Sequence, residues 1–139
     1  MLEISPQLQA KVFDSVVLCL RSGPKPWGKL SVALRGLGLD KPVADAVLFW
    51  ANTQAESSGQ TPVKIRILHP MEKEFISVEA YDYFLDLLRL GLIGPMQMEQ
   101  LIEGCAFMTV LPVNREQARS LASKSFWEGF AAQGLGTSQ

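Results

Sequence analysis

The sequence predicts a mostly α-helical (α+β) protein, with an N-terminal winged-helix-like half and a C-terminal lobe of three helices. Apolar residues recur at helical spacing in six segments, each bounded by a capping residue, a proline or a glycine. One stretch, residues 63–68, alternates apolar and polar residues as a half-buried strand does. Of the 139 residues, 47% are apolar and 19% are charged, which is the balance of a globular domain that buries a core.

The predicted N-terminal half covers residues 1–77 and begins with a helix that has clear end signals. Ser5 is a good N-cap, and Pro6 fits the first helical position because its missing N–H needs no partner there. Valine, phenylalanine and leucine residues follow at helical spacing up to Leu20. Gly23 and the prolines after it end this helix.

Residues 34–51, LRGLGLDKPVADAVLFWA, have the pattern of a helix-turn-helix. A short helix over about residues 29–37 ends in glycine, and Trp27 is expected in the loop before it or at its start. Asp40 caps the next helix, residues 41 to about 55. The apolar stripe predicted on this helix is wide and is formed by Val43, Ala44, Ala46, Val47, Leu48, Phe49, Trp50 and Ala51.

A β-hairpin is predicted to complete the winged-helix half. Residues 56–62 are polar and rich in turn formers, and residues 63–68 follow as the first strand. Residues 69–74 form the turn, and residues 75–77 are expected to return as a short second strand.

The C-terminal half, residues 78–132, is predicted to contain three helices packed on the first half. They cover residues 78–90 after Ser77, residues 95 to about 108 beginning at a proline, and residues 115–132 after Asn114. The stripe expected on the first of them is Val78, Tyr81, Phe84, Leu85 and Leu88. Residues 133–139 are expected to form a flexible tail.

The charge balance argues against a dedicated nucleic-acid-binding protein, and the cysteines are typical of a protein without disulfides. Residues 1–70 carry eight Lys/Arg against five Asp/Glu, and residues 71–139 carry five against nine, for a net charge of −1. This is far from the strongly basic balance of a dedicated nucleic-acid binder. Cys19 and Cys105 lie in apolar helical patterns, which indicates buried free thiols. Without a signal peptide or an apolar run long enough for a membrane span, the sequence favours a cytoplasmic protein.

The sequence offers little material for catalysis or cofactor binding. His69 is the single histidine and is predicted to lie exposed in a turn. One histidine and two distant cysteines cannot supply a standard structural zinc site. The glycines of residues 36–38 lack the phosphate-loop pattern and are interpreted as helix terminators. We therefore expect no enzyme activity, no cofactor, no metal and no catalytic residues.

The predicted recognition helix does not have the polar face that base reading requires. A weak, sequence-independent contact with nucleic acid would need cations for phosphates. The candidates are Lys29, Arg35, Lys41, Lys64 and Arg66.

Residues 64–93, KIRILHPMEKEFISVEAYDYFLDLLRLGLI, resemble the middle of the Smg family of small bacterial proteins. That pattern has a basic-isoleucine strand, an acidic turn, a capping residue and a Phe/Leu-rich helix. The matching residues here are Arg66, Ile67, Glu72, Ile76, Ser77, Phe84 and Leu85. Further similarity extends the resemblance to about residues 12–130. The family is of unknown function and is often found beside genes for DNA uptake and topology, so the resemblance implies no catalytic residues.

Three functions stay open from the sequence. The first is a non-enzymatic protein–protein interaction or adaptor module of Smg type, whose partner the sequence does not identify. The second is a weak nucleic-acid-binding accessory in DNA processing or transcription, and the third is a small enzyme. Fold alone does not decide among them.

Overall fold

The computed structural model describes residues 4–23, 26–59, 67–108 and 110–133. Within these residues the chain is mostly α-helical, as predicted. Its elements are α1 Pro6–Arg21, α2 Trp27–Gly36, α3 Lys41–Gly59, the 3-10 helix η1 Glu72–Glu74, α4 Val78–Leu90, α5 Pro95–Cys105 and α6 Arg115–Ala132.

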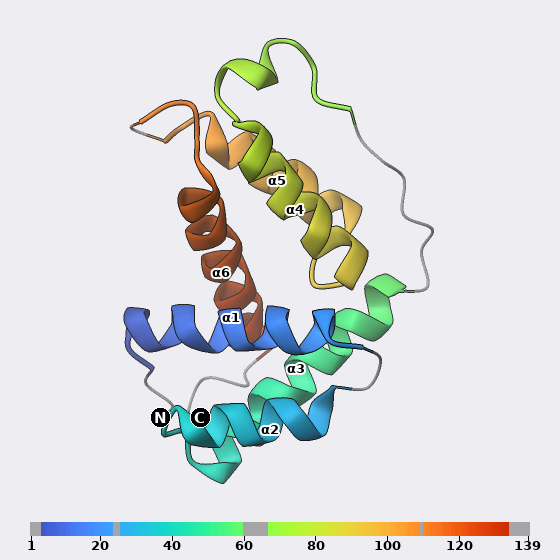
Figure 1. Ribbon diagram of the computed structural model, residues 1–139, viewed down its shortest axis with the longest axis vertical. Helices are drawn as coiled ribbons and strands as arrows, with labels where there is room; N and C mark the ends of the chain where they lie inside the picture. Colours follow the sequence, from blue (N-terminus) through green and yellow to red (C-terminus); the bar gives the residue numbers. More distant parts are fainter. Residues whose placement is uncertain (1–3, 24–25, 60–66, 109, 134–139) are drawn as a thin grey trace.

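The helices pack as two groups that share α1 (Figure 1). Helix α4 lies against α6, and α5 contacts both of them. Helix α1 crosses this group and contacts α4 and α6, and it also packs on α2. Helix α3 contacts α2 and α4. Helix α1 therefore joins the N-terminal and C-terminal halves directly.

Three of the capping residues predicted from the sequence, Ser5, Ser77 and Asn114, begin their helices. The Ser5 hydroxyl accepts the Leu8 N–H at 3.2 Å, and the Ser77 hydroxyl accepts the Ala80 N–H at 3.1 Å. Asn114 begins α6 with a capping box, described below. These side chains satisfy N–H groups that have no partner inside the helix, which fixes where each helix starts.

Several predicted boundaries need correction. Helix α3 continues to Gly59, so the first part of the predicted break at residues 56–62 is helical. Helix α2 begins at Trp27, which selects the second of the two positions expected for that residue, and α5 ends at Cys105, about three residues earlier than predicted. Polar residues exposed at a helix end do not stop the helix when no proline or tertiary contact forces a turn.

The winged-helix arrangement is not supported. Residues 63–66 lie outside the described residues, and Ile67 and Leu68 have no strand conformation. The predicted second strand is reduced to one residue, since Ile76 forms an isolated parallel bridge with Val113. Alternation of apolar and polar residues predicts an extended segment with one buried face. It does not identify the pairing partner, which here lies 37 positions later in the sequence.

Aromatic side chains from three helices form the centre of the core. Phe126 of α6 contacts Phe13 of α1, with ring centroids 5.4 Å apart, and Trp50 of α3 at 6.4 Å. Trp127 continues the cluster on α6, 5.3 Å from Phe126 and 5.1 Å from Phe130. Offset and edge-to-face contacts of this kind favour close packing of the three helices.

Two residues assigned to apolar stripes face solvent instead. Phe49 of α3 is 61% exposed, and Val78 of α4 is also exposed. Phe49 is two residues from the buried Val47, and Val78 is two residues from the buried Ala80. Two residues correspond to about 200° around a helix, so each side chain points away from the buried face.

Among the described helices, none combines the length and the apolar character that crossing a bilayer requires. The predicted tail lies outside the described residues, apart from Gln133.

Candidate functional site

Two connecting segments meet at the end of the molecule where α4 and α6 begin (Figure 1). The Ser77 N–H donates to the Val113 carbonyl at 3.0 Å, and the Val113 N–H donates to the Phe75 carbonyl at 2.8 Å. These bonds fasten the segment before α6 to the segment before α4. Side chains on both segments are therefore presented from the same end.

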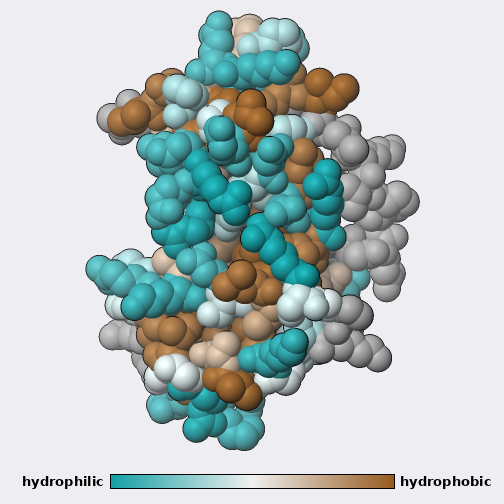
Figure 2. Space-filling view, in the orientation of Figure 1, coloured by the Kyte–Doolittle hydropathy of each residue, from teal (hydrophilic) through white to brown (hydrophobic). Residues whose placement is uncertain are grey.

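This end of the molecule exposes several large apolar side chains. We call the set the apolar end, and its members are 48% to 84% exposed: Met71, Val78, Phe107, Val110 and Leu111. Figure 2 shows hydrophobic surface near this end, above a hydrophilic belt that crosses the middle of the molecule. Scattered exposed apolar residues are common, but several large ones on two bonded segments indicate an interaction surface.

Acidic residues lie close in sequence to members of the apolar end. Glu74 lies in η1, Glu79 follows Val78 in the first turn of α4, and Glu103 lies one turn before Phe107. All three are exposed. The exposed Lys73 offsets part of this charge, so the local balance stays negative.

A second feature is a hollow of about 450 Å³ between α1, α4 and α6, which we call the arginine hollow. It is lined by Asp14, Val17, Leu18, Arg21, Tyr83, Arg115, Glu116 and Arg119. Arg119 Nη1 lies 3.0 Å from Asp14 Oδ2, and Arg119 also pairs with Glu116. Arg21 pairs with Asp86 at 2.5 Å.

Tyr83 is the buried polar residue of the arginine hollow. Its side chain is almost fully enclosed, with 4% of the residue exposed, and its hydroxyl has no hydrogen-bond partner among the described residues. The guanidinium of Arg115 lies over its ring, 5.2 Å from the centroid. Burial, and then the negative charge of Asp14, raise the pKa of Tyr83 to about 12. The hydroxyl is therefore protonated and able to donate at neutral pH.

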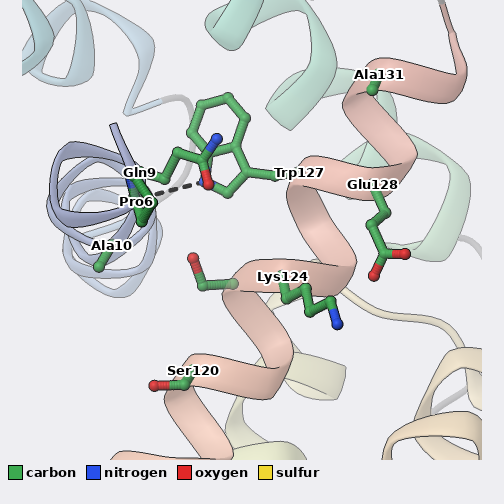
Figure 3. Close-up of a pocket in the computed structure, with 9 residues that line it drawn as sticks. Pro6, Gln9, Ala10, Ser120, Lys124, Trp127, Glu128 and Ala131 are labelled. Carbon is green, nitrogen blue, oxygen red and sulfur yellow. Dashed lines mark hydrogen bonds between the residues drawn. The ribbon is translucent and has the colours of Figure 1, made fainter. Parts of the chain in front are cut away.

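Figure 3 shows a third feature, a groove of about 500 Å³ between α1 and α6. The Trp127 indole lies between the two helices and donates to the Gln9 carbonyl at 3.1 Å. Lys124 and Glu128 point away from α1. The indole is already bonded and the charged groups face solvent, so the groove is explained by the packing of α1 on α6.

The structure describes three of the five residues predicted to contact nucleic acid. Lys29 and Arg35 are exposed on α2, six residues apart, which places them on different faces of that helix. Lys41 begins α3, and its Nζ lies 2.7 Å from Asp45 Oδ2. Lys64 and Arg66 lie outside the described residues.

His69 has a role in a turn. It is exposed, its Nδ1 accepts the Met71 N–H at 3.3 Å, and its own backbone N–H donates to the Glu72 carboxylate at 2.8 Å. In the part of the chain that the structure describes, no three His, Cys, Asp or Glu residues are grouped to hold a metal ion.

Both cysteines are free thiols. Cys105 is fully buried, and burial raises its pKa to about 11. Cys19 is half-buried, and burial raises its pKa against the opposing effect of Lys29. Both thiols are thus disfavoured as nucleophiles at neutral pH.

Comparison of the chain with protein-family models, with curated proteins and with solved structures gave no match. The molecule has two candidate surfaces, the apolar end and the arginine hollow.

Neither surface was predicted from the sequence. The arginine hollow depends on contacts such as Asp14 with Arg119, which are 105 positions apart and leave no local signal. The apolar end did have one signal. Residues 105–113, CAFMTVLPV, are apolar except for Thr109 and extend beyond the end of α5, which is unusual for a solvated loop.

Proposed function

We propose that this chain is a non-enzymatic interaction module of Smg type, which binds a protein partner through the apolar end. The observation that supports this proposal is the set of exposed apolar side chains on two segments joined by backbone hydrogen bonds. Water contact with such side chains is unfavourable, and a partner that covers them gains free energy from their burial. The rigid attachment of both segments lowers the entropy that binding would otherwise lose.

The surroundings of the apolar end indicate the chemistry of the partner. Phe107 and Val110 are exposed anchors, and the exposed Glu74, Glu79 and Glu103 lie on or beside the same two segments. A complementary partner segment carries apolar side chains flanked by Lys or Arg. Charge complementarity at the rim of an interface raises the association rate more than the final affinity.

We also propose that the protein acts in the cytoplasm. Cys19 and Cys105 are both free, which suits a reducing compartment. The proposed module needs neither a cofactor nor a catalytic residue.

The experiment is a comparison of partner capture by three forms of the full chain. The test form is the double variant Phe107→Ser, Val110→Ser. The control is Val32→Ser, which changes an equally exposed apolar residue on α2. All three should have similar unfolding free energies, because exposed substitutions typically change stability by less than about 0.5 kcal/mol.

The proposal expects a protein with a basic-flanked apolar segment to be captured by the wild type and the control and lost by the double variant. The purified partner segment should then bind with an affinity at least about tenfold weaker for the double variant. Equal binding by all three forms would contradict the proposal. Self-association abolished by the double variant, or capture of nucleic acid in place of protein, would also contradict it.

A further inference from the structure

Arg115 differs from the other arginines of the hollow in having no carboxylate partner among the described residues. Arg119 is paired with Asp14 and Glu116, and Arg21 is paired with Asp86. Arg115 is exposed and its guanidinium lies over the ring of Tyr83, 5.2 Å from the centroid, so its N–H groups have no carboxylate acceptor among the described residues. A guanidinium in this state can donate two parallel hydrogen bonds to a planar anion.

Tyr83 supplies a second unused donor beside Arg115. Its hydroxyl is buried and unpartnered among the described residues, which is an unfavourable and uncommon state for a polar group. Four charged residues that line the hollow act on this hydroxyl electrostatically: Asp14, Arg21, Arg115 and Arg119. Tyr83 also lines the hollow, so its buried hydroxyl and these four charged groups belong to one site.

The charge balance of the hollow selects the kind of anion. The two carboxylates that line it, Asp14 and Glu116, both pair with Arg119, whose single positive charge offsets only one of them, and they would repel a doubly charged phosphate. One unpaired cation, Arg115, remains to attract a single negative charge. A carboxylate has this charge, and its two oxygens fit the guanidinium fork.

One wall of the hollow is apolar. Val17 and Leu18 of α1 line it, and the Leu18 side chain is exposed. The volume of about 450 Å³ is that of a site for a small ligand. We propose that the arginine hollow binds a carboxylate attached to an apolar group, with Arg115 and Tyr83 as donors and Val17 and Leu18 against the apolar part.

A carboxylate of this kind has two sources, a free small acid and the last residue of a peptide chain. Both present the same chemistry to Arg115. The hollow shares no residue with the apolar end, so variants at one surface leave the other unchanged, and the two proposals can fail separately.

The experiment is an NMR titration of the ¹⁵N-labelled full chain with N-acetyl-leucine and, as the uncharged control, N-acetyl-leucinamide. The acid should shift amide signals around residues 14–21, 83 and 115–119 in a saturable way. The dissociation constant should be about 1 mM, as suits a ligand of this size. The amide should produce no saturable shift.

Variants of the two donors test the assignment. Arg115→Gln should weaken acid binding by roughly tenfold or more, and Tyr83→Phe should weaken it severalfold. Arg115→Lys should fall between wild type and Arg115→Gln, because lysine keeps the charge without the fork. Arg35→Gln on α2 is the matched control and should bind as the wild type does. Spectra of each variant without ligand establish that it is folded.

A second arm distinguishes the two sources. Tighter binding of the peptide Ala-Ala-Leu than of N-acetyl-leucine supports a peptide C-terminus, and equal or weaker binding supports a free acid. The proposal is overturned if acid and amide shift the same signals equally. It is also overturned if Arg115→Gln leaves the affinity unchanged, or if no shift occurs at about ten times the expected dissociation constant.

Discussion

Trp50 links the two halves of the molecule through one side chain. It is 6% exposed, and its indole N–H donates to the Phe126 carbonyl of α6 at 3.1 Å. Its ring also lies so close to Gly129 that a Cβ there would be 2.7 Å from Trp50 Cζ2. The residue therefore contributes burial, a hydrogen bond and a close packing contact at the same point.

Replacement of Trp50 by alanine should destabilise the protein strongly. The change removes a buried ring and leaves a cavity, with an expected loss of about 3–5 kcal/mol in unfolding free energy. Lys41→Ala is the control, since the Lys41–Asp45 pair is exposed and such pairs contribute little. Urea denaturation of both variants measures the difference. A Trp50→Ala value within about 0.5 kcal/mol of wild type would contradict the burial described here.

Gly129 of α6 and Gly104 of α5 are both helical glycines, so alanine substitutions at the two positions can be compared. Alanine at a helical glycine should stabilise by up to about 1 kcal/mol from propensity alone. At Gly104 nothing lies within 4 Å of the new Cβ, so Gly104→Ala should be neutral or stabilising. At Gly129 the new Cβ meets the Trp50 ring, and the resulting strain of about 1–3 kcal/mol should make Gly129→Ala destabilising. Thermal melts that rank the two variants in the opposite order would disprove this packing.

At the scale of the element, α6 depends on its first turn. The Asn114 side chain accepts the Gln117 N–H at 2.8 Å, and the Gln117 side chain accepts the Asn114 N–H at 2.9 Å. This reciprocal arrangement satisfies donors that the helix cannot satisfy internally. It lies directly beside Arg115 and the Ile76–Val113 bridge, so the cap also positions both candidate surfaces.

Asn114→Ala should cost about 1 kcal/mol of unfolding free energy, because one capping hydrogen bond is lost. Hydrogen exchange should become faster at the first amides of α6 and stay unchanged in α2. Asn114→Asp keeps the acceptor and should retain most of the stability. Equal loss in the alanine and aspartate variants would show that the cap hydrogen bond is not the cause.

At the scale of the whole molecule, the N-terminal and C-terminal halves are joined by extensive contacts between their helices. Helix α1 packs on α4 and α6, Trp127 of α6 donates to Gln9 of α1, and Arg119 of α6 pairs with Asp14 of α1. These contacts connect the first helix to the last. One half could unfold separately only if these contacts between α1 and the C-terminal helices were broken first.

The chain should therefore unfold in one cooperative transition. Helix content by circular dichroism and tryptophan fluorescence should give the same midpoint in denaturant. Trp50→Ala should shift both curves together, although the residue belongs to the N-terminal half. Two separated transitions, with only one of them moved by Trp50→Ala, would show that the halves fold independently.

The sequence by itself determined where most helices begin and end. Ser5, Ser77 and Asn114 were identified as caps because a cap acts over three residues and is visible in the local sequence. The burial of Trp50 was also predicted, since helical spacing aligns it with Val43 and Val47. The boundaries of α3 and α5 were less accurate, because exposed helix ends carry weaker signals.

Only the tertiary structure decided which residues form the candidate surfaces. Ile76 pairs with Val113 rather than with a hairpin partner, and that pairing joins the segment before α4 to the segment before α6. Arg115, Tyr83 and Val17 meet in the arginine hollow because α1, α4 and α6 pack together. Local sequence fixes backbone hydrogen bonds within a few residues, whereas a binding surface depends on contacts between residues that are far apart in the chain.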